Sequence, residues 1–374
     1  MLQLRRRRPV IARHRALQTV RGRNFIRRSA AFQRHFRPGG QGCRARVRCI
    51  RAKRQGWFVT LDSKTAGVYA IAPTPFHEDG AIDFASIDRM VDFYFEVGCD
   101  GLTVLGVLGE SSKLDPSEAL AVAERVIKRA AGKPVIVGVS SPGFAAMRAL
   151  ARSVMDTGAA GVMVGPTGTL RTDDQITAYF RGAAEAIGAD VPWVLQDFPL
   201  VTDVVMTPGV IRRIVTENPS LMVLKHEDWP GLEKISTLRR YEEDGSMRHI
   251  SILVGNNGLF LDFELDRGVD GANTGYAFPD MLVECVRLAK QGKRDAAHDL
   301  FDAHLPLLRY EQQQGVGLAV RKYILKRRGI LGSETMRKPC TPLTATSRAE
   351  VEYLMDRLAL RDARAMRKLR LASI

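Results

Sequence analysis

Residues 134–165 read PVIVGVSSPGFAAMRALARSVMDTGAAGVMVG, and this stretch decides the fold class. Two short apolar runs, 134–139 and 161–165, flank a longer segment whose apolar residues recur at helical spacing. An apolar run without alternation is typical of a strand that is buried on both faces. A strand, a helix and a second strand in this order predict a parallel sheet with a helix crossing between its strands.

The same pattern recurs along most of the chain. Six further apolar runs begin at residues 67, 101, 192, 221, 250 and 271. Together the eight runs have a mean step of about 29 residues, roughly the length of one strand and one helix. Helical periodicity covers 84–97, 116–129 and 209–217, and the last two begin with an Asp-Pro and a Thr-Pro start signal. Eight units predict an α/β fold of the (β/α)₈ TIM-barrel type. The alternative, an open doubly wound sheet, lacks the expected GxGxxG loop after the first run.

The chain divides into three parts by its composition. After Pro279 the pattern indicates helices only, over about 280–290, 294–312, 318–328 and 347–361. We therefore expect a basic N-terminal arm, a barrel and a C-terminal helical appendage. Their predicted bounds are 1–64, 65–280 and 281–374.

The net charge of +15 comes entirely from the arm. Residues 1–61 hold 18 Lys and Arg and no Asp or Glu, which leaves 38 basic and 41 acidic residues for the rest. The barrel thus offers no basic face to nucleic acid. The arm has the composition of a disordered segment. It is either an organelle transit peptide, a polyanion-binding tail, or sequence upstream of a true start near Val59.

The cysteines and the hydropathy pattern exclude other classes of protein. Five cysteines are widely spread, without a CxxC pair or a His/Cys metal spacing, so we expect reduced thiols, a cytoplasmic protein and no metal. Cys99 and Cys285 lie in apolar patterns and are expected in the core. No apolar run approaches about 18 residues, so no membrane span is expected.

Lys225 follows the apolar run 221–224 directly, and is the first candidate for chemistry. Active sites of such barrels lie where the strands end. A lysine is rarely buried, and burial disfavours its charged form. A neutral amine at this place can attack a ketone and form a Schiff base. The alternative is a lysine at the barrel rim that pairs with Glu227 or Asp228.

The second candidate follows the run that begins at residue 101. Residues Gly106, Val107, Leu108, Gly109 and Glu110 form a loop with two glycines. Glycines let backbone N–H groups approach an anion closely, so the loop can hold a small carboxylate. A tight turn that needs glycine for its dihedral angles is the alternative.

Five segments, in this order, resemble the dihydrodipicolinate synthase / N-acetylneuraminate lyase superfamily. They are YAIAPTPF (69–76), DGAID (79–83), GVLGESSKL (106–114), Leu224-Lys225 and GNN (255–257). The resemblance covers nearly all of the chain beyond the arm. It implies a (β/α)₈ barrel, Lys225 as the imine-forming lysine, and the loop 106–110 as the site of a keto-acid carboxylate. It also implies a homotetramer of paired dimers.

The chain departs from this family at the proton relay. The family's Thr is Val107 here, with Leu108 as its neighbour, and the Tyr of its Leu-Tyr-Asn-x-Pro strand is Gln196. The Tyr that a neighbouring subunit supplies falls in 166–168, where no Tyr stands, and the Arg for an aldehyde's carboxylate is Val201. These groups cannot transfer a proton or bind a carboxylate in the same way. The departures argue against synthesis of dihydrodipicolinate.

Three residues are candidates to act beside Lys225. Gln196 can orient a carbonyl or a water, and Glu110 is a carboxylate that serves structure in the family. Tyr276 either reaches the barrel mouth or covers its rim. Asp197 and His226 should face away from the barrel interior, because strand residues alternate in direction.

The sequence therefore predicts a lyase of the class I aldolase or dehydratase type that acts on a 2-keto acid such as pyruvate. No metal or organic cofactor is expected. The alternative is a non-catalytic keto-acid-binding or regulatory barrel that has lost the relay, and a weaker one is a nucleic-acid protein acting through its arm. The loop 166–170 is small and apolar, which favours a subunit interface at the barrel rim.

Overall fold

Eight parallel strands close into a barrel in the order of the chain, β1 beside β2 and so on to β8, which pairs again with β1. The structure is a computed structural model and describes residues 59–366. The predicted (β/α)₈ barrel is confirmed. The strands are β1 (Gly67–Ile71), β2 (Gly101–Val104), β3 (Val135–Gly138), β4 (Gly161–Val164), β5 (Trp193–Asp197), β6 (Leu221–His226), β7 (Ser251–Val254) and β8 (Gly271–Thr274).

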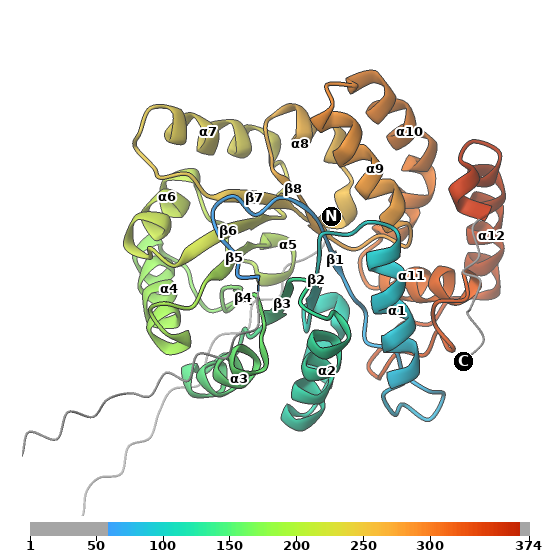
Figure 1. Cartoon of the computed structure of the whole chain (residues 1–374), viewed down its shortest axis with the longest axis horizontal. Helices are drawn as coiled ribbons and strands as arrows, with labels where there is room; N and C mark the ends of the chain where they lie inside the picture. The colour runs from blue at the N-terminus through green and yellow to red at the C-terminus, as the bar shows by residue number, and fades with distance from the viewer. Residues whose placement is uncertain (1–58, 367–374) are drawn as a thin grey trace, which may run out of the picture. The chain divides into compact units, whose positions relative to one another are not determined.

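A ring of helices surrounds the strands (Figure 1). The helices are α1 (Phe84–Glu96), α2 (Pro116–Arg129), α3 (Phe144–Thr157), α4 (Asp173–Ile187), α6 (Pro208–Glu217), α7 (Leu232–Glu243), α8 (Leu261–Asp266) and α9 (Pro279–Lys290), with the short α5 (Pro199–Thr202) after β5. The predicted start signals act as expected. The side chain of Asp115 accepts from the N–H groups of Ser117 and Glu118, and that of Thr207 accepts from Val210 N–H.

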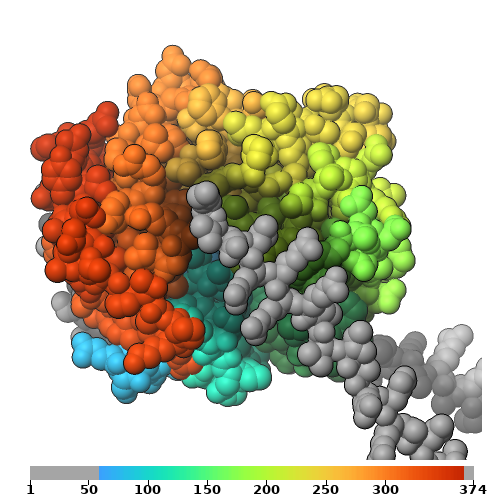
Figure 2. Space-filling model, turned by 180° about the vertical axis from the view of Figure 1, so that it is seen from behind, coloured from blue at the N-terminus to red at the C-terminus, as the bar shows by residue number. Residues whose placement is uncertain are grey.

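The C-terminal part is helical, as predicted. It contains α10 (Arg294–Glu311), α11 (Gly317–Arg327) and α12 (Ala345–Ala359). The predicted boundary at residue 281 falls inside α9, which packs beside β1 and completes the ring. The appendage therefore begins after α9. It lies on the flank of α1, where Gly332 N–H donates to Ser86 Oγ at 2.9 Å and Arg337 Nε donates to Gly80 O at 3.0 Å (Figures 1 and 2).

Two separate hydrophobic clusters explain why the strands lack alternation. One strand face packs against the helices, and the other fills the barrel with Tyr69, Ile136, Met163, Val194, Val223 and Leu253. Leu61 joins the inner cluster, and its N–H donates to Ala160 O at 3.0 Å, beside the start of β4. Leu61 thus closes the barrel at the ends where the strands begin. Residue 61 was expected in the disordered arm, but its burial makes it part of the barrel.

Several sequence predictions concern residues outside the described range. These are the interpretations of the arm up to residue 58, together with Cys43 and Cys49. Cys99 and Cys285 are buried as expected, and burial raises the pKa of the Cys285 thiol to about 12. Within residues 59–366, no helix is long and apolar enough to cross a bilayer.

Candidate active site

Lys225 lies near the end of β6, and its side chain points into the barrel mouth. Its neighbours across the sheet are Gln196 on β5 and Leu253 on β7. Only 3% of the residue is exposed, although it carries an amine. Its Nζ lies 2.7 Å from Oε1 of Glu227, two residues further along. Lys225 is therefore buried at a strand end, and it also pairs with Glu227, one of the two carboxylate partners proposed for it from the sequence.

A cavity of about 400 Å³ opens above Lys225 at the ends of the strands. The strands contribute Ile71, Gln196 and Thr274 to its wall, together with Lys225. The loops contribute Val107, Leu108, Phe198, Leu200, Val201, Glu227, Asn256 and Asn257. The turn between α10 and α11, from Glu311 to Leu318, contributes the rest with Arg321 of α11. The C-terminal helical part is thus one wall of the barrel's candidate site.

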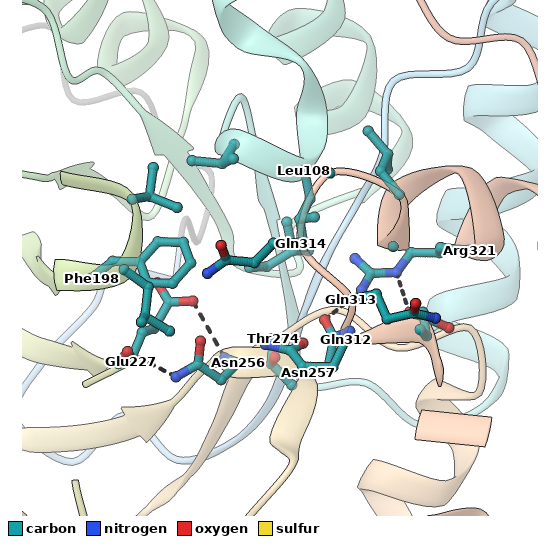
Figure 3. Close-up of a pocket in the computed structure, with 18 of the residues that line it drawn as sticks. Leu108, Phe198, Glu227, Asn256, Asn257, Thr274, Gln312, Gln313, Gln314 and Arg321 are labelled. Carbon is teal, nitrogen blue, oxygen red and sulfur yellow. Dashed lines mark hydrogen bonds and ion pairs between the residues drawn. The ribbon is translucent and has the colours of Figure 1, made fainter. Parts of the chain in front are cut away.

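Glu227 is the centre of a small polar network. Its Oε1 accepts a hydrogen bond from Gln196 Nε2 at 2.8 Å, and Oε2 lies 3.4 Å from the N–H of Asn256. Asn256 Nδ2 donates to the backbone carbonyl of Glu227 at 2.8 Å. Figure 3 shows Glu227 and Asn256 together on one side of the cavity, and Arg321 on the opposite side. The network holds the carboxylate against Lys225.

Gly255 leaves the space that the Glu227 side chain fills. A Cβ atom at position 255 would lie 2.2 Å from Glu227 Cγ and 2.4 Å from Oε2. Its φ angle of −111° is not left-handed, and the Glu227 side chain occupies the space where a Cβ atom would stand. The sequence suggested no such coupling between the loop after β7 and the end of β6.

Asp197 follows Gln196 on β5, and His226, the last residue of β6, lies between Lys225 and Glu227. Both side chains face the helices. Asp197 Oδ2 lies 2.9 Å from Lys234 Nζ and 3.5 Å from His226 Nδ1. Lys234 Nζ is also 2.5 Å from Asp228 Oδ2. Asp197, His226 and Lys234 are buried between β5, β6 and α7. They form a cluster behind Lys225 and do not line the cavity.

The loop after β2 brings two of its five candidate residues to the cavity. Val107 and Leu108 line it, in a short 3₁₀ turn (Val107–Gly109). Gly109 O accepts a hydrogen bond from Thr74 Oγ1 at 2.6 Å, which fixes the loop to the end of β1. Gly106 opens the turn and does not line the cavity.

Glu110 lies outside the cavity, unlike the prediction that placed it with substrate. Its φ angle of 54° turns the chain away, and the side chain is fully buried beneath the C-terminal part. The carboxylate lies 2.5 Å from Lys322 Nζ and 2.9 Å from Lys113 Nζ, and accepts from Arg337 N–H at 3.1 Å. Glu110 thus anchors the C-terminal helices to the barrel.

Tyr276 also lies away from the cavity. Its hydroxyl is 3.1 Å from His304 Nδ1, and His304 Nε2 is 2.8 Å from Asp362 Oδ2. Burial raises the pKa of Tyr276 well above its ordinary value. Because β8 ends at Thr274, strand alternation does not carry Tyr276 into the barrel. Its position corresponds to the alternative interpretation, an aromatic residue that packs at the rim.

Arg321 and the preceding glutamines were not identified from the sequence. Arg321 Nε pairs with Glu311 Oε1 at 2.6 Å, and Nη2 donates to Asn257 Oδ1 at 2.5 Å and Gly275 O at 2.8 Å. Its Nη1 has no partner within the described residues. Gln312, Gln313 and Gln314 precede α11, and Figure 3 shows Gln314 reaching between Phe198 and Leu108. Nothing in the sequence indicated that this turn folds back over the barrel.

The cavity is lined by two carboxylates, Glu227 and Glu311, and they have different hydrogen-bond partners. Glu311 has both oxygens occupied, since Oε1 meets Arg321 and Oε2 accepts from Ala277 N–H at 3.1 Å. Burial raises the pKa of Glu311. Among the residues that the structure describes, only Glu227 presents its carboxylate to Lys225. Most other polar lining groups are amides, and among residues 59–366 no cluster of His, Cys, Asp and Glu could hold a metal ion. The site is therefore suited to an amine and a carboxylate acting on an organic substrate.

Comparison with known proteins gives consistent results. A model of the "Dihydrodipicolinate synthetase family" matches residues 64–358. The L-2-keto-3-deoxyarabonate dehydratase of Azospirillum brasilense is 29% identical over 297 residues, which are 78% of this chain and 94% of that protein. The 4-hydroxy-tetrahydrodipicolinate synthase of Pelobacter propionicus is 31% identical over 294 residues, 77% of this chain and 96% of that protein.

A solved structure extends the likeness to three dimensions. The crystal structure of dihydrodipicolinate synthase from Rhodopseudomonas palustris is 67% identical in sequence, with a TM-score of 0.79. The match covers 80% of this chain and 99% of the other. The family model includes every strand and every residue of the cavity, as well as the C-terminal turn that lies over it. The chain therefore belongs to the dihydrodipicolinate synthetase family.

Proposed function

We propose that this protein is a Schiff-base lyase that acts on a 2-keto acid through Lys225. The observation that carries the proposal is the buried Lys225 amine at the floor of a cavity, where the barrel strands end. The amine adds to the C2 carbonyl, and loss of the carbonyl oxygen as water leaves a protonated imine. The imine withdraws electrons from C3, so a C–C bond can break or form, or water can leave, beside it.

The loop after β2 is the proposed site for the keto-acid carboxylate. Val107 and Leu108 open the 3₁₀ turn, and their N–H groups have no partner among the described residues. Free N–H groups at a turn favour an anion. We assign the carboxylate to these groups together with Gly106 and Gly109, which shape the turn.

The amide groups that line the cavity support a hydroxylated, uncharged substrate chain. The amides of Gln196, Asn256 and Gln314 can donate to and accept from hydroxyl groups. Val201 stands where the family resemblance implies an Arg for a second carboxylate. The name of the Azospirillum relative denotes dehydration of a hydroxylated 2-keto acid. These features favour dehydration or aldol cleavage of such an acid over synthesis of dihydrodipicolinate, and no metal or organic cofactor is required for either.

Trapping of the imine tests the proposal. Wild-type protein is incubated with pyruvate, and then with hydroxylated 2-keto acids, in the presence of borohydride. Peptide mass spectrometry should find the reduced adduct on Lys225. Lys225→Met serves as the control, with folding checked by circular dichroism, and should carry no adduct. A wild-type protein that forms no adduct with any acid of the panel contradicts the proposal.

A non-catalytic keto-acid-binding barrel is the second candidate. It is favoured by one observation, the absence of any tyrosine from the described lining of the cavity. Such a protein would form the adduct on Lys225 but release no product from any hydroxylated 2-keto acid. Product analysis on the same panel separates the two candidates.

We also propose a cytoplasmic homotetramer, a dimer of dimers assembled through the barrel rim. The loop 166–170 supports this, because its four residues after Pro166 are small or apolar and are half-buried or exposed. Sedimentation of a chain that starts at Val59 tests it, and a monomer at micromolar concentration contradicts it. The loop brings no tyrosine to a neighbour, so mixing in Lys225→Ala subunits should leave the activity per wild-type subunit constant.

A further inference from the structure

We infer that Glu227 is the catalytic acid and base of this site, in place of the hydroxyl relay that the chain lacks. The inference rests on the proposed imine at Lys225. It assigns a role to a residue that the sequence offered only as an ion-pair partner of that lysine.

Glu227 lies on the barrel wall on the same side as Lys225. Its N–H continues the β5–β6 ladder by donating to Asp197 O at 2.9 Å, so residues 225 and 227 point to the same side. The resulting distance of 2.7 Å joins the carboxylate to the nitrogen that becomes the imine. C2 of a bound keto acid is one bond from that nitrogen and C3 is two, so Glu227 lies within reach of both reacting carbons.

Among the described residues, the cavity holds no group that competes with Glu227 for a proton beside Lys225. Glu311 is bound to Arg321 and to Ala277 N–H. Within residues 59–366, the lining contains no Tyr, His, Cys or Asp. Amides and the Arg321 guanidinium do not exchange protons readily near neutral pH. Glu227 is therefore the described side chain best suited to accept and return a proton beside Lys225.

The surrounding residues support and accommodate this carboxylate. Gln196, which stands where the resemblance implies a Tyr, donates to its Oε1. Asn256 holds the backbone on the other side through its Nδ2. Gly255 leaves the space for the side chain. The residue that replaces the Tyr, Gln196, is thus the same residue that holds the Glu227 carboxylate in place.

In the proposed reaction, Glu227 gives up or takes up one proton at each step. As the amine adds to C2, Glu227 in its acid form protonates the departing hydroxyl, which leaves as water and gives the protonated imine. The resulting carboxylate removes a proton from C3, and the electron pair neutralises the imine nitrogen to give an enamine. With a hydroxyl on the next carbon, the enamine expels it, and the Glu227 carboxylic acid returns its proton to form water.

Exchange of pyruvate methyl hydrogens with D₂O isolates the C3 step. Wild-type protein should exchange them, as followed by ¹H NMR. Glu227→Gln keeps the shape and the amide contacts but has no proton to transfer, so exchange should fall by about 100-fold or more. Borohydride should still trap pyruvate on Lys225 in this variant. Glu227→Asp should retain partial exchange.

Two controls separate catalysis from support of the fold. Asp228→Asn makes the same chemical change one residue away, outside the lining of this cavity, and should leave exchange unchanged. In Glu227→Ala, added formate should restore exchange in proportion to its concentration, which a purely structural loss would not allow. Exchange by Glu227→Gln within about threefold of wild type, against the loss expected for general acid–base catalysis, overturns the inference. Absence of an adduct in wild type instead defeats the proposed function itself.

Discussion

The carboxylate of Glu110 meets the ammonium of Lys322 at 2.5 Å, across 212 residues of chain. Neither side chain is exposed, and burial lowers the pKa of Lys322 against the opposing effect of Glu110. Glu110 belongs to the loop that carries Val107 and Leu108, and Lys322 follows Arg321 on α11. One ion pair therefore joins two walls of the cavity.

Removal of one partner alone should destabilise the fold, because it leaves the other partner buried. Lys322→Met leaves a buried carboxylate short of a partner, and we expect a loss of about 3 kcal/mol in the free energy of unfolding. Glu110→Gln combined with Lys322→Met should lose less than the sum of the single changes. Urea denaturation measures each. Arg125→Met, which breaks the exposed pair with Asp88, should change little. If Lys322→Met and Arg125→Met lose the same unfolding free energy, the buried pair stabilises the fold no more than the exposed pair does.

Gly255→Ala should impair the site through overlap with the Glu227 side chain. Its new methyl group would overlap the Glu227 side chain. Overpacking of this kind costs about 1–3 kcal/mol, and here it also displaces the carboxylate from Lys225. We expect pyruvate hydrogen exchange to fall at least tenfold, in the range of general acid–base effects. Gly143→Ala is the matched control, since nothing lies within 4 Å of its added Cβ. Unchanged exchange in Gly255→Ala would mean that the carboxylate tolerates displacement.

Gln314→Ala should affect the hydroxylated substrate more than pyruvate. Its side chain lines the cavity and reaches between Phe198 and Leu108 in Figure 3. Loss of one hydrogen bond to a substrate hydroxyl is worth about 1 kcal/mol, so KM should rise about fivefold. Trapping of pyruvate on Lys225 should remain at the wild-type level. If trapping of pyruvate falls as well, the turn before α11 shapes the whole cavity and Gln314 does not act on the substrate hydroxyl alone.

Glu264 makes folding stability depend on pH. Burial, with a smaller effect of Asp262, raises its pKa to about 8, and Oε2 has no partner within the described residues. The folded protein therefore keeps this proton at pH values where the unfolded chain has released it. Stability from this group is lost as the pH rises from about 4.5 towards 8, and is constant above that range.

Glu264→Gln should remove this dependence. Relative to wild type, the variant should gain more than about 1 kcal/mol in unfolding free energy between pH 5 and pH 8. Chemical denaturation at the two pH values measures the difference. Glu185→Gln, at an exposed position of α4, provides the comparison and should shift both values equally. A Glu264→Gln curve parallel to that of wild type contradicts the assignment.

The fold was predictable because local patterns suffice for it. Most of the buried strands are apolar runs, and helices such as α2 and α6 carry their own start signals at Asp115 and Thr207. Lys225 was identifiable for the same reason, since a lysine at the end of such a run departs from the pattern. Strand alternation also anticipated that Asp197 and His226 would face the helices.

The rest of the site depends on contacts between distant segments. Glu227 was visible as a neighbour of Lys225, but its support from Gln196 and the space beside Gly255 come from two other strand ends. Tyr276 follows a strand too short to fix its direction. Arg321 sits on a helix that reads as part of an appendage, and only the turn of the chain after α10 brings it to the barrel. Tertiary packing, which no local pattern encodes, decides these positions.

The wall supplied by the turn before α11 has a consequence for protein synthesis. A ribosome delivers the barrel strands first, and the segment from Gln312 to Arg321 emerges only after all eight of them. Until then the nascent barrel holds Lys225 in a cavity that lacks one side, where water has free access to the amine. The protein should therefore become active only when the segment from Gln312 to Arg321 has been synthesised. A chain that terminates before residue 321 should lack this wall of the cavity.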